Sequence, residues 1–398
     1  MELLGLVTLL FGAKLGGSLF RKFGQPGVAG ELLAGVLLGP YVLSLVSPSG
    51  LIDSMAEIGL IFLVLLISMG IDWKKTGSDT GIHSRIEIVR CILIFTGIFL
   101  IGMLSGWGFY TTVIVCMMAI LTSTAVISRT LMGTDHIRSH AGQTMMSLLA
   151  IGEMAGIIVL MAVAGFVENS AISIELTASL AVVMGGFFLL LGKGGEKLAN
   201  GFTALVRRYN AEDIMLGLTL VMAFTFSSLT RSLNMASLLG VFFAGALLSR
   251  SSQNTSISRK VRDVGEGFFI PFFFASIGLG LNVFLIQVQI YYILALAAAL
   301  IGVKWACTTM TFRMFRYSIH DSVKIGSGMI SLSELTVVMA AMAFSTTNPA
   351  LLSVLVTAFV ITNTASPLIT SMVFRLNPGG GQFFRVSGEK TSYTFRKD

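Results

Sequence analysis

The sequence predicts an all-α polytopic membrane protein with about thirteen transmembrane helices. Of its 398 residues, 54% are hydrophobic and only 12% are charged, whereas a soluble protein of this length needs more charge to cover its surface. Apolar runs of roughly 20 residues, the length that crosses a bilayer core about 30 Å thick, recur along the chain. The basic residues also gather in alternate loops between these runs, as they do in polytopic membrane proteins.

The predicted spans fall into two sets, which together occupy residues 1–375 as one transmembrane domain. The first set covers residues 3–20, 28–46, 51–71, 88–106, 109–128, 143–166 and 174–192. The second set covers residues 212–229, 235–249, 267–287, 290–312, 325–345 and 349–373. Residues 376–398 combine three consecutive glycines with mixed charges, so we expect a disordered cytoplasmic tail there.

The positions of the basic residues predict the orientation. Every lysine and arginine except Lys14, Arg231 and Lys304 is assigned to the tail or to a loop after an odd-numbered span. Basic loops stay on the cytoplasmic side, so the N-terminus is expected outside and the C-terminus inside. The net charge of +7 therefore reflects topology and attraction to anionic lipid, not nucleic-acid binding. We expect an integral protein of a bacterial or archaeal plasma (inner) membrane.

Ionisable side chains at membrane depth are candidate functional residues, because burying each one costs several kcal/mol. Glu153, Lys304 and Glu334 are predicted to lie deep in the sixth, eleventh and twelfth spans. The neighbours Gly152 and Gly156 leave room for water or another backbone beside the Glu153 carboxylate. A carboxylate that binds either a proton or Na+ or K+ is the simplest one-for-one exchanger, and a structural glutamate paired with Lys304 is the alternative. Lys304 is expected to pair with Glu153. Either this ion pair breaks when a cation binds Glu153, or it is permanent and stabilises helix packing.

Two polar segments predict interrupted helices. Thr122, Ser123 and Thr124 interrupt the fifth span, and residues 326–334 interrupt the twelfth. Unwound backbone at membrane depth is tolerated beside a cavity, where carbonyl groups coordinate cations. Hydroxyl residues also occur in ordinary membrane helices, where they bond to their own backbone. The two spans are an odd number apart, so the segments would run in opposite directions, as in inverted repeats.

Three further segments resemble a known family. Residues 22–40 read KFGQPGVAGELLAGVLLGP, and residues 56–63 and 271–279 read AEIGLIFL and PFFFASIGL. Together with the Thr-Ser-Thr run, they resemble the monovalent cation:proton antiporter-2 family, which includes bacterial Na+/H+ antiporters and Kef-type potassium efflux proteins. The resemblance covers roughly residues 5–375.

The resemblance implies a Na+/H+ antiporter fold with two crossing interrupted helices and a homodimer that moves ions by an elevator-like displacement. The core domain would cover approximately residues 88–166 and 290–373, and the other helices would form the dimerisation scaffold. Glu153 takes the position of the family's ion-carrying aspartate, and Lys304 that of a basic residue in the eleventh span. The implied cation ligands are Glu153 and Thr124, with Ser123 and Thr122 beside them; Lys304 and Glu334 are candidates for ion pairing or coupling, and Gly152, Ser333 and Asn363 for other core roles.

One small-residue pattern bears on the homodimer. Gly12 and Gly16 form a Gly-x-x-x-Gly pattern in the first span. Such patterns let two membrane helices approach closely. We therefore expect this face of the first span to lie in the dimer interface.

The chain departs from the family pattern at Gly152, where relatives carry Asp, Asn or Gln before the ion-carrying acid. A site with one carboxylate favours electroneutral exchange of Na+ or K+ for H+. Two alternatives remain open: an uncoupled Kef-like cation pathway, and a non-transporting membrane sensor or assembly subunit. We expect no enzyme activity, no cofactor beyond the transported ions and no attached nucleotide-binding regulatory domain, because no nucleophile motif, metal-ligand spacing or soluble domain is present in the sequence.

Overall fold

The structure is a computed structural model that describes residues 2–70, 80–134, 136–137, 139–169, 186, 195–201, 214–232 and 237–376. Six of the described helices are long and apolar enough to cross a membrane, and shorter apolar helices lie between them. This architecture confirms the predicted all-α polytopic class. The number of thirteen spans stays a prediction, because the span at 174–192 falls almost entirely outside the described residues. The predicted tail after residue 376 falls outside them as well.

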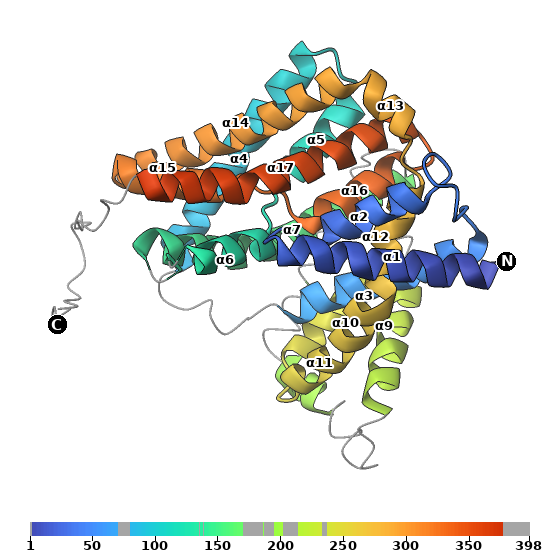
Figure 1. The fold of residues 1–398 in the computed structure, drawn as a ribbon. Helices are drawn as coiled ribbons and strands as arrows, with labels where there is room; N and C mark the ends of the chain where they lie inside the picture. Colours follow the sequence, from blue (N-terminus) through green and yellow to red (C-terminus); the bar gives the residue numbers. More distant parts are fainter. Residues whose placement is uncertain are drawn as a thin grey trace.

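The described helices pack as two groups that lie side by side (Figure 1). The first group contains α1 (Glu2–Lys22), α2 (Gly27–Leu38), α3 (Gly50–Met69), α9 (Ile214–Ser232), α10 (Ser237–Ser249), α11 (Asn254–Val264), the π-helix η1 (Gly265–Phe269) and α12 (Ile270–Leu279). The second contains α4 (Thr80–Leu104), α5 (Phe109–Ile120), α6 (Thr124–Gly133), α7 (His140–Asn169), α13 (Val283–Val288), α14 (Ile290–Met314), α15 (Ile319–Gly328), α16 (Glu334–Phe344) and α17 (Pro349–Leu376).

Both predicted interruptions are present. α5 ends at Ile120 and α6 begins at Thr124, while α15 ends at Gly328 and α16 begins at Glu334. The second half of each broken helix starts in the same way. Ser123 caps α6 by accepting a hydrogen bond from the amide of Val126, and Ser333 caps α16 by accepting one from the amide of Leu335, both at 3.3 Å. A serine side chain at this position satisfies one of the amides that a helix start leaves unpaired.

Several predicted elements differ from the structure, including the span at 267–287, which is divided between α12 and α13. α2 ends at Leu38 rather than near residue 46, because Pro40 holds the preceding residue, Gly39, in an extended conformation that cannot continue a helix. α4 begins at Thr80, so Glu87 and Arg90 belong to a helix and not to a polar loop. α11 was not predicted as a helix, because its apolar side is narrow among exposed polar residues.

The glycine pattern in α1 faces a neighbour within the same chain, so the expected role in a dimer interface is wrong. A Cβ atom added at Gly16 would collide with the carbonyl oxygen of Gly30 in α2, and one at Gly30 would collide with that of Gly16. The absence of side chains at these two positions lets α1 and α2 touch backbone to backbone, which is how small residues drive helix packing in membranes. The same principle joins α2 to α12, where Gly278 meets the carbonyl of Leu32.

Candidate cation site between two broken helices

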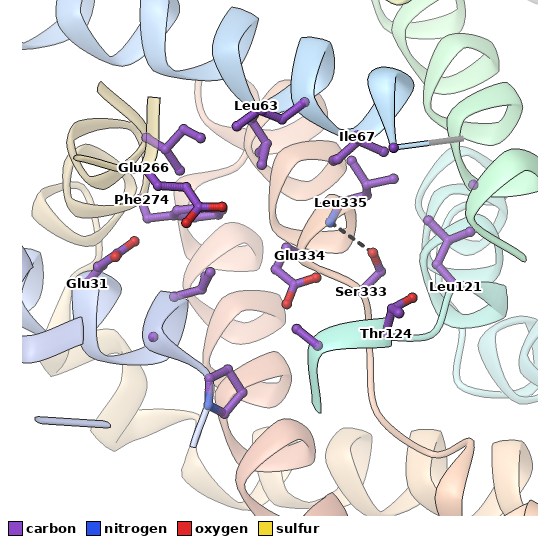
Figure 2. A pocket seen from close by; sticks show the side chains of 18 of the residues that line it. Glu31, Leu63, Ile67, Leu121, Thr124, Glu266, Phe274, Ser333, Glu334 and Leu335 are labelled. Carbon is purple, nitrogen blue, oxygen red and sulfur yellow. Dashed lines mark hydrogen bonds between the residues drawn. The ribbon is translucent and has the colours of Figure 1, made fainter. Parts of the chain in front are cut away.

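A cavity of about 490 Å³ lies between the two helix groups and reaches both helix breaks. The second group contributes Thr122, Thr124, Gly152, Gly156, Ser333 and Glu334 to its wall. The first group contributes Glu31 from α2 and Glu266 from η1, together with apolar residues of α3 and α12. Figure 2 shows Glu31 and Glu266 on one side of the cavity and Thr124 and Ser333 on the other, with Glu334 between them.

The C-terminal end of α5 is capped by two buried cations. Lys304 of α14 is fully buried, and its Nζ atom donates to the carbonyl oxygens of Ala119 at 2.8 Å and Leu121 at 2.6 Å, and to Oγ1 of Thr122 at 3.3 Å. Arg90 of α4 donates from Nη2 to the intervening carbonyl of Ile120 at 3.1 Å. A helix end carries unpaired carbonyls and partial negative charge, so cations stabilise it. These contacts hold the break open at a fixed place.

The N-terminal ends of α6 and α16 meet at the same place. The hydroxyl of Ser123 donates to Oε1 of Glu334 at 3.0 Å, which joins the cap of α6 to the first residue of α16. Helix N-termini carry partial positive charge and favour carboxylates. The two half-helices therefore stabilise a carboxylate such as Glu334 at the wall of the cavity.

Asn363 of α17 supports the second break from outside. Its Oδ1 accepts from the amide of Leu332 at 2.7 Å, and its Nδ2 donates to the carbonyl of the same residue at 2.9 Å. Leu332 lies in the unwound segment, where it has no helical hydrogen bonds, and Asn363 is fully buried. The amide side chain thus replaces the missing backbone partners on both sides of Leu332, as buried polar groups require.

Replacing Asn363 by leucine is expected to lower the free energy of unfolding by about 2–4 kcal/mol, because two buried backbone groups lose their partners. Thermal unfolding in detergent measures the effect. Thr357→Val on the same helix is the matched control, since in the described part of the chain the hydroxyl of Thr357 donates to the carbonyl of Ser353, one turn away in its own helix. A loss no larger than that of the control would contradict the role assigned to Asn363.

Of the two predicted cation ligands Thr124 and Glu153, the structure describes the side chain of Thr124 but not that of Glu153. Thr124 lines the cavity, and within the part of the chain that the structure describes its Oγ1 is buried without a hydrogen-bond partner. Glu153 lies in α7, but its side chain is outside the described residues. The residue before it, Gly152, and Gly156 one turn further on both line the cavity. The predicted pair between Lys304 and Glu153 stays a prediction.

Several buried charges were not predicted from the sequence, Glu31, Glu87 and Arg90 among them. Glu87 and Arg90 lie in α4, where they form an ion pair with a 2.8 Å bond between Nε of Arg90 and Oε2 of Glu87. Their i, i+3 spacing with opposite charge was a usable signal, but the predicted span began too late to include both. Glu31 is also buried, with Oε1 at 3.9 Å from Nη1 of Arg21. Its place inside an apolar, glycine-rich stretch was the signal for depth.

Comparisons with known proteins agree with this geometry. The family described as sodium/hydrogen exchanger, transmembrane, matches residues 6–376. The chain is 24% identical to the probable Na+/H+ antiporter GerT of Bacillus cereus, covering 84% of this chain and 89% of the relative. It is 24% identical to the Na+/H+-K+ antiporter GerN of Bacillus cereus, covering 85% of this chain and 87% of the relative. It is 25% identical to the high-affinity Na+/H+ antiporter NhaS3 of Synechocystis, covering 94% of this chain and 89% of the relative.

A solved structure shares the fold. The sodium proton antiporter MjNhaP1 of Methanocaldococcus jannaschii superposes with a TM-score of 0.66 over 96% of this chain and all of that chain, at 15% sequence identity. The likeness therefore extends through both helix groups and both broken helices. With the family match over nearly the whole described chain, these findings show that the protein belongs to the sodium/hydrogen exchanger transmembrane family, a family of membrane transporters and not of enzymes.

Proposed function

We propose that this protein exchanges Na+ or K+ for H+, one for one, with the carboxylate of Glu153 as the group that binds either the cation or the proton. The observation that carries the proposal is the cavity at the two helix breaks. Its wall contains the hydroxyl of Thr124, which has no hydrogen-bond partner among the described residues, and Gly152 and Gly156 on either side of Glu153 in α7. A monovalent cation needs several oxygen ligands to replace its water. Thr124, Thr122 and unwound carbonyls supply them beside a carboxylate.

The position of the cavity supports alternating access. One side of the cavity is formed by the group that contains α4–α7 and α14–α17. The other side is formed by the group that contains α1–α3 and α9–α12. We assign the first of these sets to a core that moves and the second to a scaffold, close to the predicted core of residues 88–166 and 290–373. Sliding the core along the scaffold would expose the site first on one side of the membrane and then on the other.

The same proposal places the protein in its membrane. We assign the C-terminus to the cytoplasmic side of a bacterial or archaeal plasma membrane, because most basic residues would then face the cytoplasm. We also propose that the protein works as a homodimer. The names of GerT, GerN and NhaS3 support this choice of exchanged ions. All three names give Na+ and H+, and that of GerN also gives K+.

Reconstituted protein in liposomes tests the exchange. A pH gradient is imposed with a pH-sensitive dye inside, and Na+, K+ or Li+ is added in turn, with and without a potassium-valinomycin clamp. Electroneutral exchange predicts that at least one cation dissipates the gradient and that the clamp changes the rate little. Cation flux without proton movement would support the uncoupled pathway instead, and the absence of any flux would favour a non-transporting sensor or assembly subunit.

A further inference from the structure

Gly152, the residue before Glu153, has no side chain, and the carboxylate of Glu87 lies in the space beside it. An added Cβ atom on residue 152 would sit 3.2 Å from Oε1 of Glu87, with the rest of that carboxylate as its next neighbour. Glu87 belongs to α4 and is buried with 3% of its surface exposed. A carboxylate from α4 therefore reaches the place where a residue 152 side chain would begin.

The carboxylate of Glu87 is held in that place by Arg90. Nε of Arg90 donates to Oε2 at 2.8 Å, and Nη2 donates to Oε1 at 2.5 Å and also to the carbonyl of Ile120 at 3.1 Å. Such a two-bond pairing fixes both the position and the orientation of the carboxylate. The pair thereby connects α4 and the end of α5 to the backbone of α7 at Gly152.

The ion pair between Glu87 and Arg90 also reduces the positive charge beside the cavity. Arg90 and Lys304 are both buried around the end of α5, so two positive charges lie at the break whose residues Leu121 and Thr122 line the cavity. Like charges in a site of low dielectric repel a cation strongly. Because Glu87 neutralises Arg90, Lys304 is the positive charge at this break, among the described residues, that remains to oppose a cation at Glu153. Among the described residues, the thiol of Cys91 also contacts this carboxylate, with Sγ 3.6 Å from Oε1 of Glu87.

We infer that Glu87 of α4 supplies, next to Glu153, the carboxylate that residue 152 cannot supply because it is a glycine. It acts as a positioning residue, because it orients Arg90 against α5 and cancels the charge of Arg90 without itself carrying the ion. This inference rests on the proposed function in one respect, namely that a cation binds at Glu153. Its geometric part, the shared space of Glu87 and a residue 152 side chain, stands by itself.

An exchange of the carboxylate between the two positions tests the inference. Glu87→Ala alone is expected to raise the KM for the transported cation by about tenfold to a hundredfold, because Arg90 is left unpaired near the site. Gly152→Asp alone is expected to impair folding or transport, since two carboxylates then compete for one space. The double variant Glu87→Ala/Gly152→Asp is expected to restore the KM to within about threefold of wild type.

Two controls separate charge from packing. The double variant Glu87→Ala/Gly152→Asn has nearly the same shape without the charge and should not restore the KM. The double variant Glu87→Gln/Arg90→Met removes both charges and should bring the KM closer to wild type than Glu87→Gln alone. An unchanged KM in Glu87→Ala, or no recovery in a folded Glu87→Ala/Gly152→Asp protein, would overturn the inference.

Thermal unfolding of the same variants keeps the inference testable apart from transport. Gly152→Asp is expected to destabilise wild type but to stabilise Glu87→Ala, a change of sign that needs no ion flux. If wild type shows no exchange and this change of sign is still observed, the proposed function fails and the replacement by Glu87 stands. If Gly152→Asp destabilises both backgrounds equally, the replacement fails whatever the transport assay shows.

Discussion

Replacing Glu153 by glutamine is expected to reduce cation-driven proton exchange to the rate of protein-free liposomes. A neutral amide neither takes up a proton nor supplies the charge that compensates a dehydrated cation, so both halves of the cycle are lost. Glu153→Asp keeps the charge and should retain measurable exchange with an altered KM. The measurement is the dye assay described above, run for each variant at matched protein content.

Glu266→Gln is the matched control for this prediction. Glu266 also lines the cavity, but its side chain is 57% exposed and it pairs with Arg262 at 3.2 Å. Removing its charge should therefore leave exchange close to the wild-type rate, because exposed pairs contribute little. Proton-coupled exchange at wild-type rate in Glu153→Gln would contradict the assignment of Glu153 and move attention to Glu334, the described carboxylate on the α16 side of the cavity.

Replacing Lys304 by methionine is expected to cost roughly 2–5 kcal/mol of folding free energy. Methionine has a similar length but no donor, so the carbonyls of Ala119 and Leu121 would lose the ammonium that now caps them. Thermal unfolding in detergent should show a lower midpoint, and exchange should fall because the break in α5 is no longer held. Lys304→Arg keeps donors at this position and should lose less stability.

A double-mutant cycle identifies the partner that matters for Lys304. If the carbonyls of α5 are its main partners, adding Glu153→Gln to Lys304→Met leaves the stability as low as in the single variant. If a pair with Glu153 dominates, the second change removes an unpaired buried charge and recovers part of the loss. The contacts of Lys304 in the described part of the chain favour the first outcome.

Sequence reasoning worked where a signal is local and strong. Long apolar runs identify membrane helices because lipid demands them over a full bilayer thickness. Clusters of hydroxyl residues and glycine inside such runs identified both breaks, since few segments at membrane depth carry so many polar groups. The residues Thr124, Ser123 and Glu334 were predicted on this basis, and the structure brings all three to one place.

Other features depended on which helices become neighbours, and no single segment encodes that. Gly12 and Gly16 permit close approach to any small-residue surface, and only the packed fold shows that this surface is α2. Lys304 needs a buried acceptor. The sequence suggests Glu153, a pair that stays a prediction, and the fold adds the open carbonyls at the end of α5, nearly two hundred positions away along the chain.

Glu87 shows the difference most clearly. The sequence by itself determined that the chain is a multi-span membrane protein, that two of its helices are broken and that Glu153 is preceded by a glycine, which has no side chain. Only the tertiary structure decided that a carboxylate from α4 lies beside Gly152, because that contact depends on the packing of α4 against α5 and α7. The pattern of apolar residues along a segment predicts whether a side chain is buried. Which residue that side chain then contacts depends on how the helices pack.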